Sequence, residues 1–257
     1  MQKVRAKKHL GQHFLNDTSI AKRIVDSLNT PADVPVLEIG PGMGVLTQYL
    51  AGNRKLKVVE IDTESVEYLS ETYPDLRGNI ISDDFLKLDI SQIFDVPYSI
   101  IGNFPYNISS QIMFKVLEAR DSVPQVVCML QREVARRIAS GPGNKDYGIL
   151  SVFLQAYYDI EYLFTVNEGV FTPPPKVKSA VIRLTRNDVK KLNCSEDLFL
   201  KVVKAAFNQR RKTLRNSLKS FFNPDDQITR IEIFNLRPEQ LTVNDFVFLT
   251  SAVEKQT

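Results

Sequence analysis

Short apolar runs that alternate with helix-like segments constrain the fold of this chain most. Strands are predicted at residues 34–39, 56–61, 79–81, 98–101 and 125–130, and helices at residues 45–51, 63–72, 108–119 and 132–139. Such alternation is typical of a doubly wound, mostly parallel sheet with helices on both faces. The segments 160–166 and 179–184 are predicted as late strands that pair at the edge of the sheet.

The pattern changes after Asn187. The segment Phe171–Lys176 contains three prolines, which cannot continue a helix or a central strand, so a stiff connector is expected there. Beyond it, apolar residues recur at helical spacing: Phe199, Val203, Phe207, Leu214, Leu218 and Phe221. A stripe of basic residues lies beside them on the same helical projection: Lys201, Lys204, Arg211, Lys212, Arg215 and Lys219. We therefore expect a larger domain at 1–186 and a small helical domain at 187–257.

Several classes of protein are disfavoured by composition. No apolar run approaches the roughly 20 residues that span a bilayer. The basic amino terminus is not followed by an apolar segment, so it does not resemble a secretory signal. The two cysteines, Cys128 and Cys194, suggest neither a disulfide framework nor a zinc site. A cytoplasmic protein without membrane or metal is expected.

The net charge of +3 hides a strong asymmetry. Residues 1–23 carry six Lys or Arg and one Asp, and the amino-terminal cations include Lys3, Arg5, Lys7 and Lys8. Residues 187–222 carry nine Lys or Arg and three Asp or Glu, whereas the segment between is acidic. Two basic segments that flank an acidic body favour contact with a nucleic acid.

The glycine-rich segment Glu38–Gly44 follows the first predicted strand and begins the first helix. Glycines at such a place allow a tight turn and bring bare backbone against a ligand. The lysine and the serine or threonine of a phosphate-binding loop are missing. The turn resembles the dinucleotide fingerprint only in part, and a purely structural turn is the alternative.

Acidic residues close the next two strands. Glu60 stands about 20 residues after the glycines, where an acidic side chain accepts hydrogen bonds from ribose hydroxyls. Asp83, Asp84 and Phe85 follow the third strand, where a carboxylate can accept from an adenine amine. Asp62 could instead cap the following helix, and Asp83 is expected to face solvent. These positions favour an adenosyl ligand with a compact tail, so S-adenosylmethionine fits better than NAD.

The segment Asn103–Tyr106 follows the fourth strand, at the end of the sheet where α/β proteins bind ligands. An amide, a proline and an aromatic ring at this place suit a planar heterocycle that is held by its amino group and stacked on its face. A strand followed by an ordinary Pro-Tyr turn is the alternative.

Six ordered motifs resemble one family. They are Lys8–Leu15, Glu38–Gly44, Asn103–Ser109, Tyr147–Ser151, Phe171–Val177 and Phe207–Lys212. Together the motifs, which span nearly the whole chain, are similar to the adenine N6 methyltransferases of ribosomal RNA, specifically the small-subunit dimethyltransferase family. The resemblance implies a Rossmann-like α/β domain with a small helical domain, and S-adenosylmethionine as the methyl donor.

The resemblance also implies the roles of residues at the cofactor. His13 and Leu15 would border the methionine end, Gly40 would contact the cofactor through its backbone, Glu60 would hold the ribose and Asp84 would read the adenine amine. Asn103 would sit between cofactor and substrate. His13 stands where the family often has asparagine, so its contact could come from a ring nitrogen or from the backbone. Phe104 replaces the more usual leucine.

For the reaction, the resemblance implies transfer of a methyl group to an adenine amine held by Asn103 and by a backbone carbonyl of the Phe104–Pro105 turn. Tyr106 would stack on the base once it has left its helix. Phe171 would be the second ring of that sandwich, with a core phenylalanine as the alternative. The side chains expected to contact RNA phosphates are Lys7, Lys8, Arg210, Arg211, Lys212 and Arg215.

The substrate implied is two adjacent adenosines near the 3′ end of small-subunit ribosomal RNA, in the assembling small subunit, and a monomer is expected. Three other functions stay open at this point. One is the sister class that methylates an adenosine of large-subunit RNA. The others are a non-catalytic RNA-binding assembly factor and an NAD-linked oxidoreductase, against which the missing third pyrophosphate glycine counts.

Overall fold

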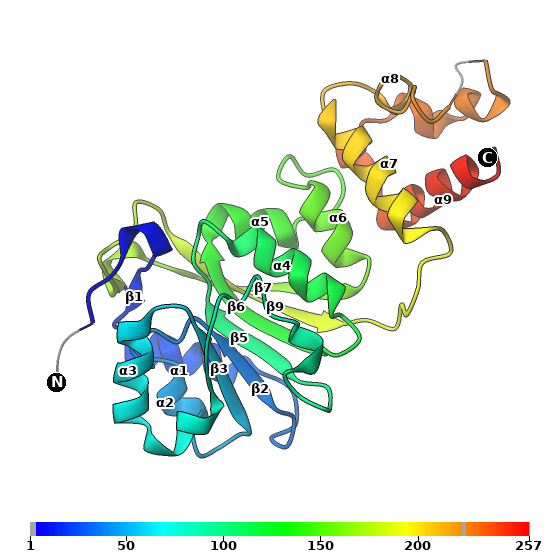
Figure 1. Ribbon diagram of the computed structural model, residues 1–257. Coiled ribbons are helices and arrows are strands. Elements are labelled where there is room, and N and C mark those ends of the chain that lie inside the picture. The colour runs from blue at the N-terminus through cyan, green and yellow to red at the C-terminus, as the bar shows by residue number, and fades with distance from the viewer. Residues whose placement is uncertain (1–3, 223–224, 257) are drawn as a thin grey trace. The chain divides into compact units, whose positions relative to one another are not determined.

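The computed structural model describes residues 4–222 and 225–256, so Lys3 lies outside the described residues. The chain divides into two units. The first comprises Met1–Ala135 and Asp159–Arg186, and the second comprises Arg136–Tyr158 and Asn187–Thr257. The ribbon is shown in Figure 1. No helix among the described residues has the length and apolar character that crossing a membrane requires.

A seven-stranded sheet forms the framework of the first unit, in the order β4-β3-β2-β5-β6-β9-β7. The strands are β2 (Val36–Ile39), β3 (Leu56–Glu60), β4 (Ile80–Ser82), β5 (Ser99–Asn103), β6 (Gln125–Gln131), β7 (Tyr158–Val166) and β9 (Ser179–Arg186). From β4 to β6 the neighbours pair in parallel, and β9 pairs antiparallel with β6. The predicted doubly wound, mostly parallel sheet is therefore present.

Burial explains the positions of the strands. Every residue of β2 is buried, as expected for a parallel strand that is covered on both faces. The two late strands differ from each other, because only β7 lies at the edge, whereas β9 is inserted between β6 and β7. The first four residues of β9 are buried, whereas in β7 only the two end residues are buried and the residues between them are partly buried or exposed. The sequence predicted both strands and their pairing at the edge of the sheet, and β9 and β7 are indeed neighbours at that edge.

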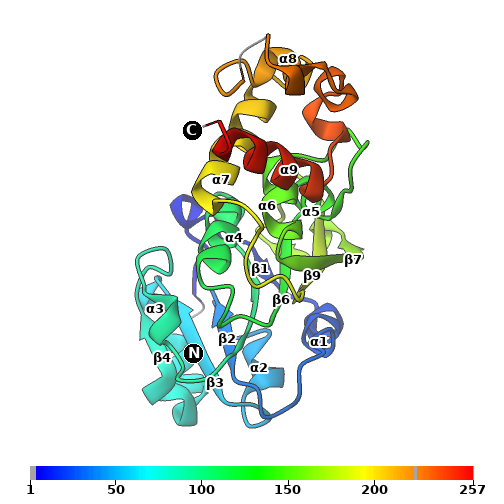
Figure 2. The ribbon, with the colours of Figure 1, turned by 90° about the vertical axis from the view of Figure 1, so that its right-hand side faces the viewer.

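Helices cover both faces of this sheet, and Figure 2 shows α1 (Thr18–Asp26) and α4 (Ser109–Glu118) on opposite sides of the strands. Helix α1 packs into one core cluster with Leu46, Leu50 and the inner residues of β2 and β3. The shorter α2 (Thr47–Leu50) and the longer α3 (Thr63–Thr72) follow β2 and β3. Asp62 caps α3 by accepting from the Glu64 N–H, as its position before the helix predicted.

A second, two-stranded sheet joins the amino terminus to the proline-rich segment. Strand β1 (Phe14–Leu15) pairs antiparallel with β8 (Phe171–Thr172). The side chain of Asn16 adds a hydrogen bond to the Thr172 hydroxyl at 2.6 Å. The sequence predicted neither strand, because two-residue strands carry no periodicity that can be recognised.

Gly102 brings β5 close to β2. A Cβ atom at this position would lie 2.5 Å from the carbonyl oxygen of Ile39, which belongs to the backbone of a central strand and cannot rotate away. We expect Gly102→Ala to lower the free energy of unfolding by roughly 1–3 kcal/mol, as other overpacked cores do. Urea unfolding measures this change, with Gly78→Ala as the control, since a Cβ at Gly78 meets no atom within 4 Å. Equal stability of both variants would contradict the close approach.

The second unit is helical. It contains α6 (Ile149–Gln155), α7 (Glu196–Asn208), α8 (Leu214–Ser217) and α9 (Val243–Glu254), and α5 (Arg132–Ala139) spans the boundary between the units. Aromatic rings link the helices: Phe153 lies 6.1 Å from Phe199, and Phe207 lies 5.9 Å from Phe246, between ring centroids. The cap of α9 is strong, because the Thr242 and Asp245 side chains each accept from the backbone N–H of the other residue.

The structure divides the chain differently from the sequence and breaks one expected helix. Residues 136–158, which the sequence assigns to the 1–186 domain, group with 187–257, so the two domains remain a prediction.

The apolar and basic stripes predicted across 199–221 do not share one helix, because α7 ends at Asn208. The chain turns at 209–213, and the Leu214 N–H donates to the Leu236 carbonyl at 2.8 Å. Phe222 is buried there, while Phe221 is partly exposed.

Candidate active site

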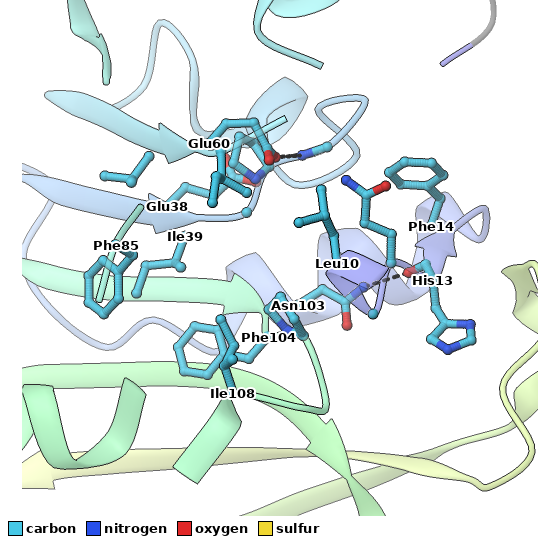
Figure 3. A pocket seen from close by; sticks show the side chains of 18 of the residues that line it. Leu10, His13, Phe14, Glu38, Ile39, Glu60, Phe85, Asn103, Phe104 and Ile108 are labelled. Atoms are coloured by element: carbon cyan, nitrogen blue, oxygen red, sulfur yellow. Dashed lines mark hydrogen bonds between the residues drawn. The ribbon is translucent and has the colours of Figure 1, made fainter. Parts of the chain in front are cut away.

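A pocket of about 210 Å³ opens at the carboxyl ends of β2, β3, β4 and β5. Parallel α/β sheets bind their ligands at this edge. The amino-terminal segment also contributes to the wall. The lining residues are 9–15, 38–43, 45–46, 59–61, 83–86 and 103–108. Figure 3 shows Leu10, Glu60 and Asn103 around a common space, whereas the ring of His13 points away from it.

The glycine-rich turn and Glu60 form one wall. Gly40 has a φ of +64°, and a Cβ there would meet no atom within 4 Å, so bare backbone faces open space. The Glu60 carboxyl is 4% exposed and accepts from two backbone N–H groups, Gly42 and Asp62, each at 3.0 Å. Burial raises the pKa of Glu60, and these two hydrogen bonds oppose the rise. The side chain is thus fixed at the place where a ribose was expected.

A second carboxyl, that of Glu38, lines the same pocket. It is 1% exposed, and burial raises its pKa to about 8. The hydroxyl of Thr47 donates to its Oε2 atom at 2.7 Å. Glu38 therefore binds a proton near neutral pH far more readily than an exposed glutamate does, and in that form its carboxyl can donate a hydrogen bond.

Asp83 and Asp84 lie at the end of β4, and both line the pocket. Asp83 is exposed, as expected, and its Oδ1 accepts from the Asp84 N–H at 2.7 Å. The Oδ1 of Asp84 accepts from the Leu86 N–H at 3.0 Å, and its Oδ2 lies 3.7 Å from the Lys87 ammonium. The Phe85 ring beside them is buried. The Asp84 carboxylate and the Phe85 ring thus line the same part of the pocket, at the end of β4.

The carboxamide of Asn103 is oriented by one hydrogen bond. Its Nδ2 donates to the backbone carbonyl of His13 at 2.9 Å, so its Oδ1 is the acceptor and points away from that carbonyl (Figure 3). The following turn is anchored by Phe104, which is 1% exposed and whose N–H donates to the Met129 carbonyl at 3.1 Å. The Pro105 carbonyl accepts from the Ile108 N–H at 3.2 Å.

The ring of Tyr106 is held at its edge and on one face. Its hydroxyl lies 2.5 Å from the hydroxyl of Ser179, which is fully buried at the start of β9. The imidazole of His13 stacks on the ring, with centroids 5.4 Å apart and an interplanar angle of 29°. The Nδ1 atom of His13 lies 2.7 Å from the Pro173 carbonyl and therefore donates its proton. Burial raises the pKa of Tyr106, so its hydroxyl stays protonated.

Leu15 lines the pocket, but Phe171 does not. Phe171 is 3% exposed and belongs to the core cluster that also contains Leu15 and Ala21. Phe171 is paired with Leu15 in the β1–β8 sheet, and both side chains belong to this core cluster. The second stacking ring at Phe171 therefore stays a prediction, and the burial of this side chain favours the alternative, a core phenylalanine.

The basic residues expected to contact RNA fall into two groups. Lys8, Arg211, Lys212 and Arg215 are exposed. Lys7 and Arg210 instead have partners within their own units. The Lys7 ammonium pairs with Asp62 and Glu64, and the Arg210 guanidinium donates to the Lys145 carbonyl and lies 4.0 Å from Glu239. RNA contact by Lys7 and Arg210 therefore stays a prediction, and in this structure each cation is engaged by nearby acceptors.

Two residues of the site were missed by sequence reasoning. Gln12 lines the pocket and donates to Asp62 at 3.2 Å, and Ser179 holds Tyr106. Gln12 falls inside the first motif, so the motif itself was the available signal. No local pattern connects Ser179 with Tyr106, because the two residues are 73 positions apart.

The charged side chains that line the pocket indicate which kind of ligand it can bind. Glu60, Asp83 and Asp84 line the pocket together with Glu38, whose carboxyl readily holds a proton, and no Lys or Arg is among the described lining residues. Such a site disfavours a phosphate-bearing ligand and suits a ligand with hydroxyls, an amine and a positive charge. Across residues 4–222 and 225–256, no three His, Cys, Asp or Glu side chains gather as metal ligands.

Comparisons with known proteins agree in pointing to one family. The family model described as "Ribosomal RNA adenine dimethylase" matches residues 3–244. A protein of Parabacteroides distasonis named "Ribosomal RNA small subunit methyltransferase A" is 60% identical over 256 residues, which are 99% of this chain and 96% of the relative.

Two solved structures are similar over nearly the whole chain. A dimethyladenosine transferase from Plasmodium falciparum superposes with a TM-score of 0.82 at 23% identity, covering 95% of this chain and 98% of the other. The 23S rRNA methyltransferase ErmE superposes with a TM-score of 0.71 at 26% identity, covering 93% and 99%.

Proposed function

Because the chain belongs to the ribosomal RNA adenine dimethylase family, we propose that it methylates two adjacent adenosines near the 3′ end of small-subunit ribosomal RNA, with S-adenosylmethionine as the methyl donor. Each target base would receive methyl groups on its N6 amine, during assembly of the small subunit. The observation that carries the proposal is the oriented Asn103 carboxamide at the mouth of an acidic pocket.

The pocket residues fit an adenosyl sulfonium. Glu60 would accept hydrogen bonds from the ribose hydroxyls, and Asp84 would accept one from the adenine amine, beside the Phe85 ring. The bare backbone of Gly40, with His13 and Leu15, would border the methionine part. When bound, S-adenosylmethionine supplies a methyl group activated by a positively charged sulfur. The carboxyl-rich lining without Lys or Arg supports this ligand over NAD.

The chain's own contribution to the chemistry is positioning. The lone pair of an adenine amine is delocalised into the ring, so the amine is a poor nucleophile. Asn103 Oδ1 and the Phe104 carbonyl would each accept one N–H of the amine, which favours a tetrahedral nitrogen with its lone pair directed at the methyl group. Pro105 has no N–H that could compete. Preorganised acceptors of this kind lower the barrier without a strong general base.

Tyr106 would stack on the target base after it has left its helix. We expect Tyr106→Ala to weaken productive RNA binding by about 1–3 kcal/mol, the worth of one stacked base. Tyr106→Phe keeps the ring, but it leaves the buried Ser179 hydroxyl without its 2.5 Å partner. Its defect should therefore be smaller, and adding Ser179→Ala should relieve it, because both polar partners are then removed.

Steady-state KM for the RNA measures both Tyr106 effects, with the affinity for S-adenosylhomocysteine as the reference. A Tyr106→Phe defect as severe as that of Tyr106→Ala, without relief by Ser179→Ala, would show that the hydroxyl takes part in the reaction. In that case the stacking role would be wrong.

RNA around the target would contact the exposed cations Lys8, Arg211, Lys212 and Arg215. These side chains lie in the two segments with the highest positive charge. Phosphate contacts position an RNA without reading its sequence, so substitution of one of these cations should weaken binding to any RNA and reduce its dependence on salt.

The experiment that tests the function uses ribosomal subunits from cells that lack this methylation. Purified protein and labelled S-adenosylmethionine are incubated with small or with large subunits, and the product is mapped by mass spectrometry. We expect N6,N6-dimethyladenosine at two adjacent positions of the small-subunit RNA. Methylation of large subunits alone would identify the sister activity, and binding without methyl transfer would identify an assembly factor.

A further inference from the structure

Residues 7–15, called here the amino-terminal strap, contribute to one wall of the pocket. Residues 9–15 of the strap line it directly. At its carboxyl end the strap is fixed by the β1–β8 pair and by the Asn103 bond to the His13 carbonyl. Its other end, around Lys7, is not part of any sheet. The side chain of Lys7 joins that end to Asp62.

Asp62 is the residue that holds this end. Its side chain is fully buried and receives the Lys7 ammonium, while its Oδ2 accepts from Gln12 Nε2 at 3.2 Å and from the Ser65 hydroxyl at 3.0 Å. Within the strap, the Lys7 N–H donates to Gln12 Oε1 at 2.8 Å. Lys7 and Gln12 therefore form a closed loop of hydrogen bonds with one carboxylate.

The electrostatics agree with a tight contact. Burial alone would raise the pKa of Asp62, but hydrogen bonds from Lys7, Gln12 and Ser65 hold it below its ordinary value. The pKa of Lys7 is raised by its hydrogen bond to Asp62. Both groups therefore remain charged through the neutral range, and the pair is charge-assisted.

Asp62 is also hydrogen-bonded to Glu60, which lines the pocket. The backbone N–H of Asp62 donates to Glu60 Oε1, and the other oxygen of Glu60 accepts from Gly42. A chain of hydrogen bonds thus runs from the strap through Asp62 to the carboxyl expected to hold the ribose and on to the glycine-rich turn. Movement of the strap at Lys7 would disturb the place where the cofactor is held.

We propose that Asp62 and Lys7 are positioning residues that keep the strap closed over the cofactor pocket and so set how long the methyl donor stays bound. The proposal rests on the proposed function, since it takes the pocket ligand to be an adenosyl donor. It gives Lys7 a role in cofactor retention in place of RNA contact. Neither residue takes part in the chemistry itself.

The test measures the dissociation rate of S-adenosylhomocysteine from the full-length protein by stopped-flow displacement. Lys7→Met keeps the length of the side chain but removes its charge, and we expect it to speed dissociation about tenfold, the weight of one charge-assisted hydrogen bond. Lys7→Arg should restore most of the retention. Lys22→Met is the matched control, because it breaks an exposed 2.7 Å ion pair with Asp26 on α1, away from the pocket.

Hydrogen exchange of residues 7–13 gives an independent readout. In the Lys7→Met protein, exchange of the strap should rise more than exchange of α1, and the Lys22→Met control should show no such rise in the strap. An unchanged dissociation rate in Lys7→Met, or an equal increase in Lys22→Met, would overturn the proposal. The dissociation assay needs no RNA. A failure to methylate RNA would therefore count against the proposed function and not against the role of Lys7 and Asp62 in holding the strap.

Discussion

Replacement of Asn103 by alanine should lower the rate of methyl transfer by about 10²- to 10³-fold, comparable to the loss of one preorganised donor or acceptor at a reacting centre. The reason is geometric. The Nδ2 bond to the His13 carbonyl leaves Oδ1 as the acceptor for the reacting amine, and alanine offers no replacement. Single-turnover methylation of small-subunit RNA measures this rate, and calorimetric titration with S-adenosylhomocysteine measures cofactor affinity. The affinity should fall far less than the rate, because the β1–β8 pair still fixes the strap.

Asn53→Ala is a suitable control for this experiment. Asn53 is exposed, and like Asn103 its Nδ2 donates to a backbone carbonyl, that of Tyr49 at 3.2 Å. Its removal should leave both quantities unchanged. Equal losses of rate and cofactor affinity in Asn103→Ala would instead identify Asn103 as a cofactor ligand without a role in aligning the amine.

Replacement of Glu60 by glutamine should weaken cofactor binding by about 100-fold, which corresponds to the loss of roughly one hydrogen bond to a charged group with rearrangement of the wall. Glutamate accepts from Gly42 and Asp62 with its two oxygens. Glutamine has only one oxygen, so its NH₂ group would face a backbone N–H and displace either the glycine-rich turn or the start of α3. Titration with S-adenosylhomocysteine measures the loss.

The control for Glu60 is Glu71→Gln, an exposed substitution of the same type on α3. Glu71→Gln should leave cofactor affinity unchanged.

The stability of the wild type should depend on pH through Glu60, whose pKa is raised in the folded state. Glu60→Gln should remove this dependence, because glutamine does not titrate. The folded state of the wild type binds the proton more strongly than the unfolded state, so this contribution to stability is lost as the pH climbs through the raised pKa. An unchanged cofactor affinity in Glu60→Gln would refute the ribose assignment.

Much of the fold followed from local pattern. The strands β2 to β6 and the helices α3, α4 and α5 were predicted from apolar runs and capping residues, because their burial on the sheet imposes that pattern. The expected α/β methyltransferase fold and the membership of the family are confirmed. The order of β9 and β7 could not be predicted, since pairing is decided by long-range packing.

The site was predicted less completely. Glu60, Asp84 and Asn103 lie at one pocket because parallel strands end at the same edge of the sheet, a rule that the sequence alone can use. The side-chain contacts of other residues around the site could not be predicted in the same way. The engagement of Lys7 by Asp62, the bond between Tyr106 and Ser179 and the burial of Phe171 join segments that are distant in the chain.

A crystal structure with bound S-adenosylhomocysteine tests the central claim most directly. We predict that the ribose hydroxyls contact Glu60 and that the sulfur atom lies beside the Asn103 carboxamide, with Oδ1 facing a space bounded by the Tyr106 ring. A sulfur atom remote from Asn103, or an Oδ1 turned toward the sheet with no space for a nucleobase next to it, would contradict the account.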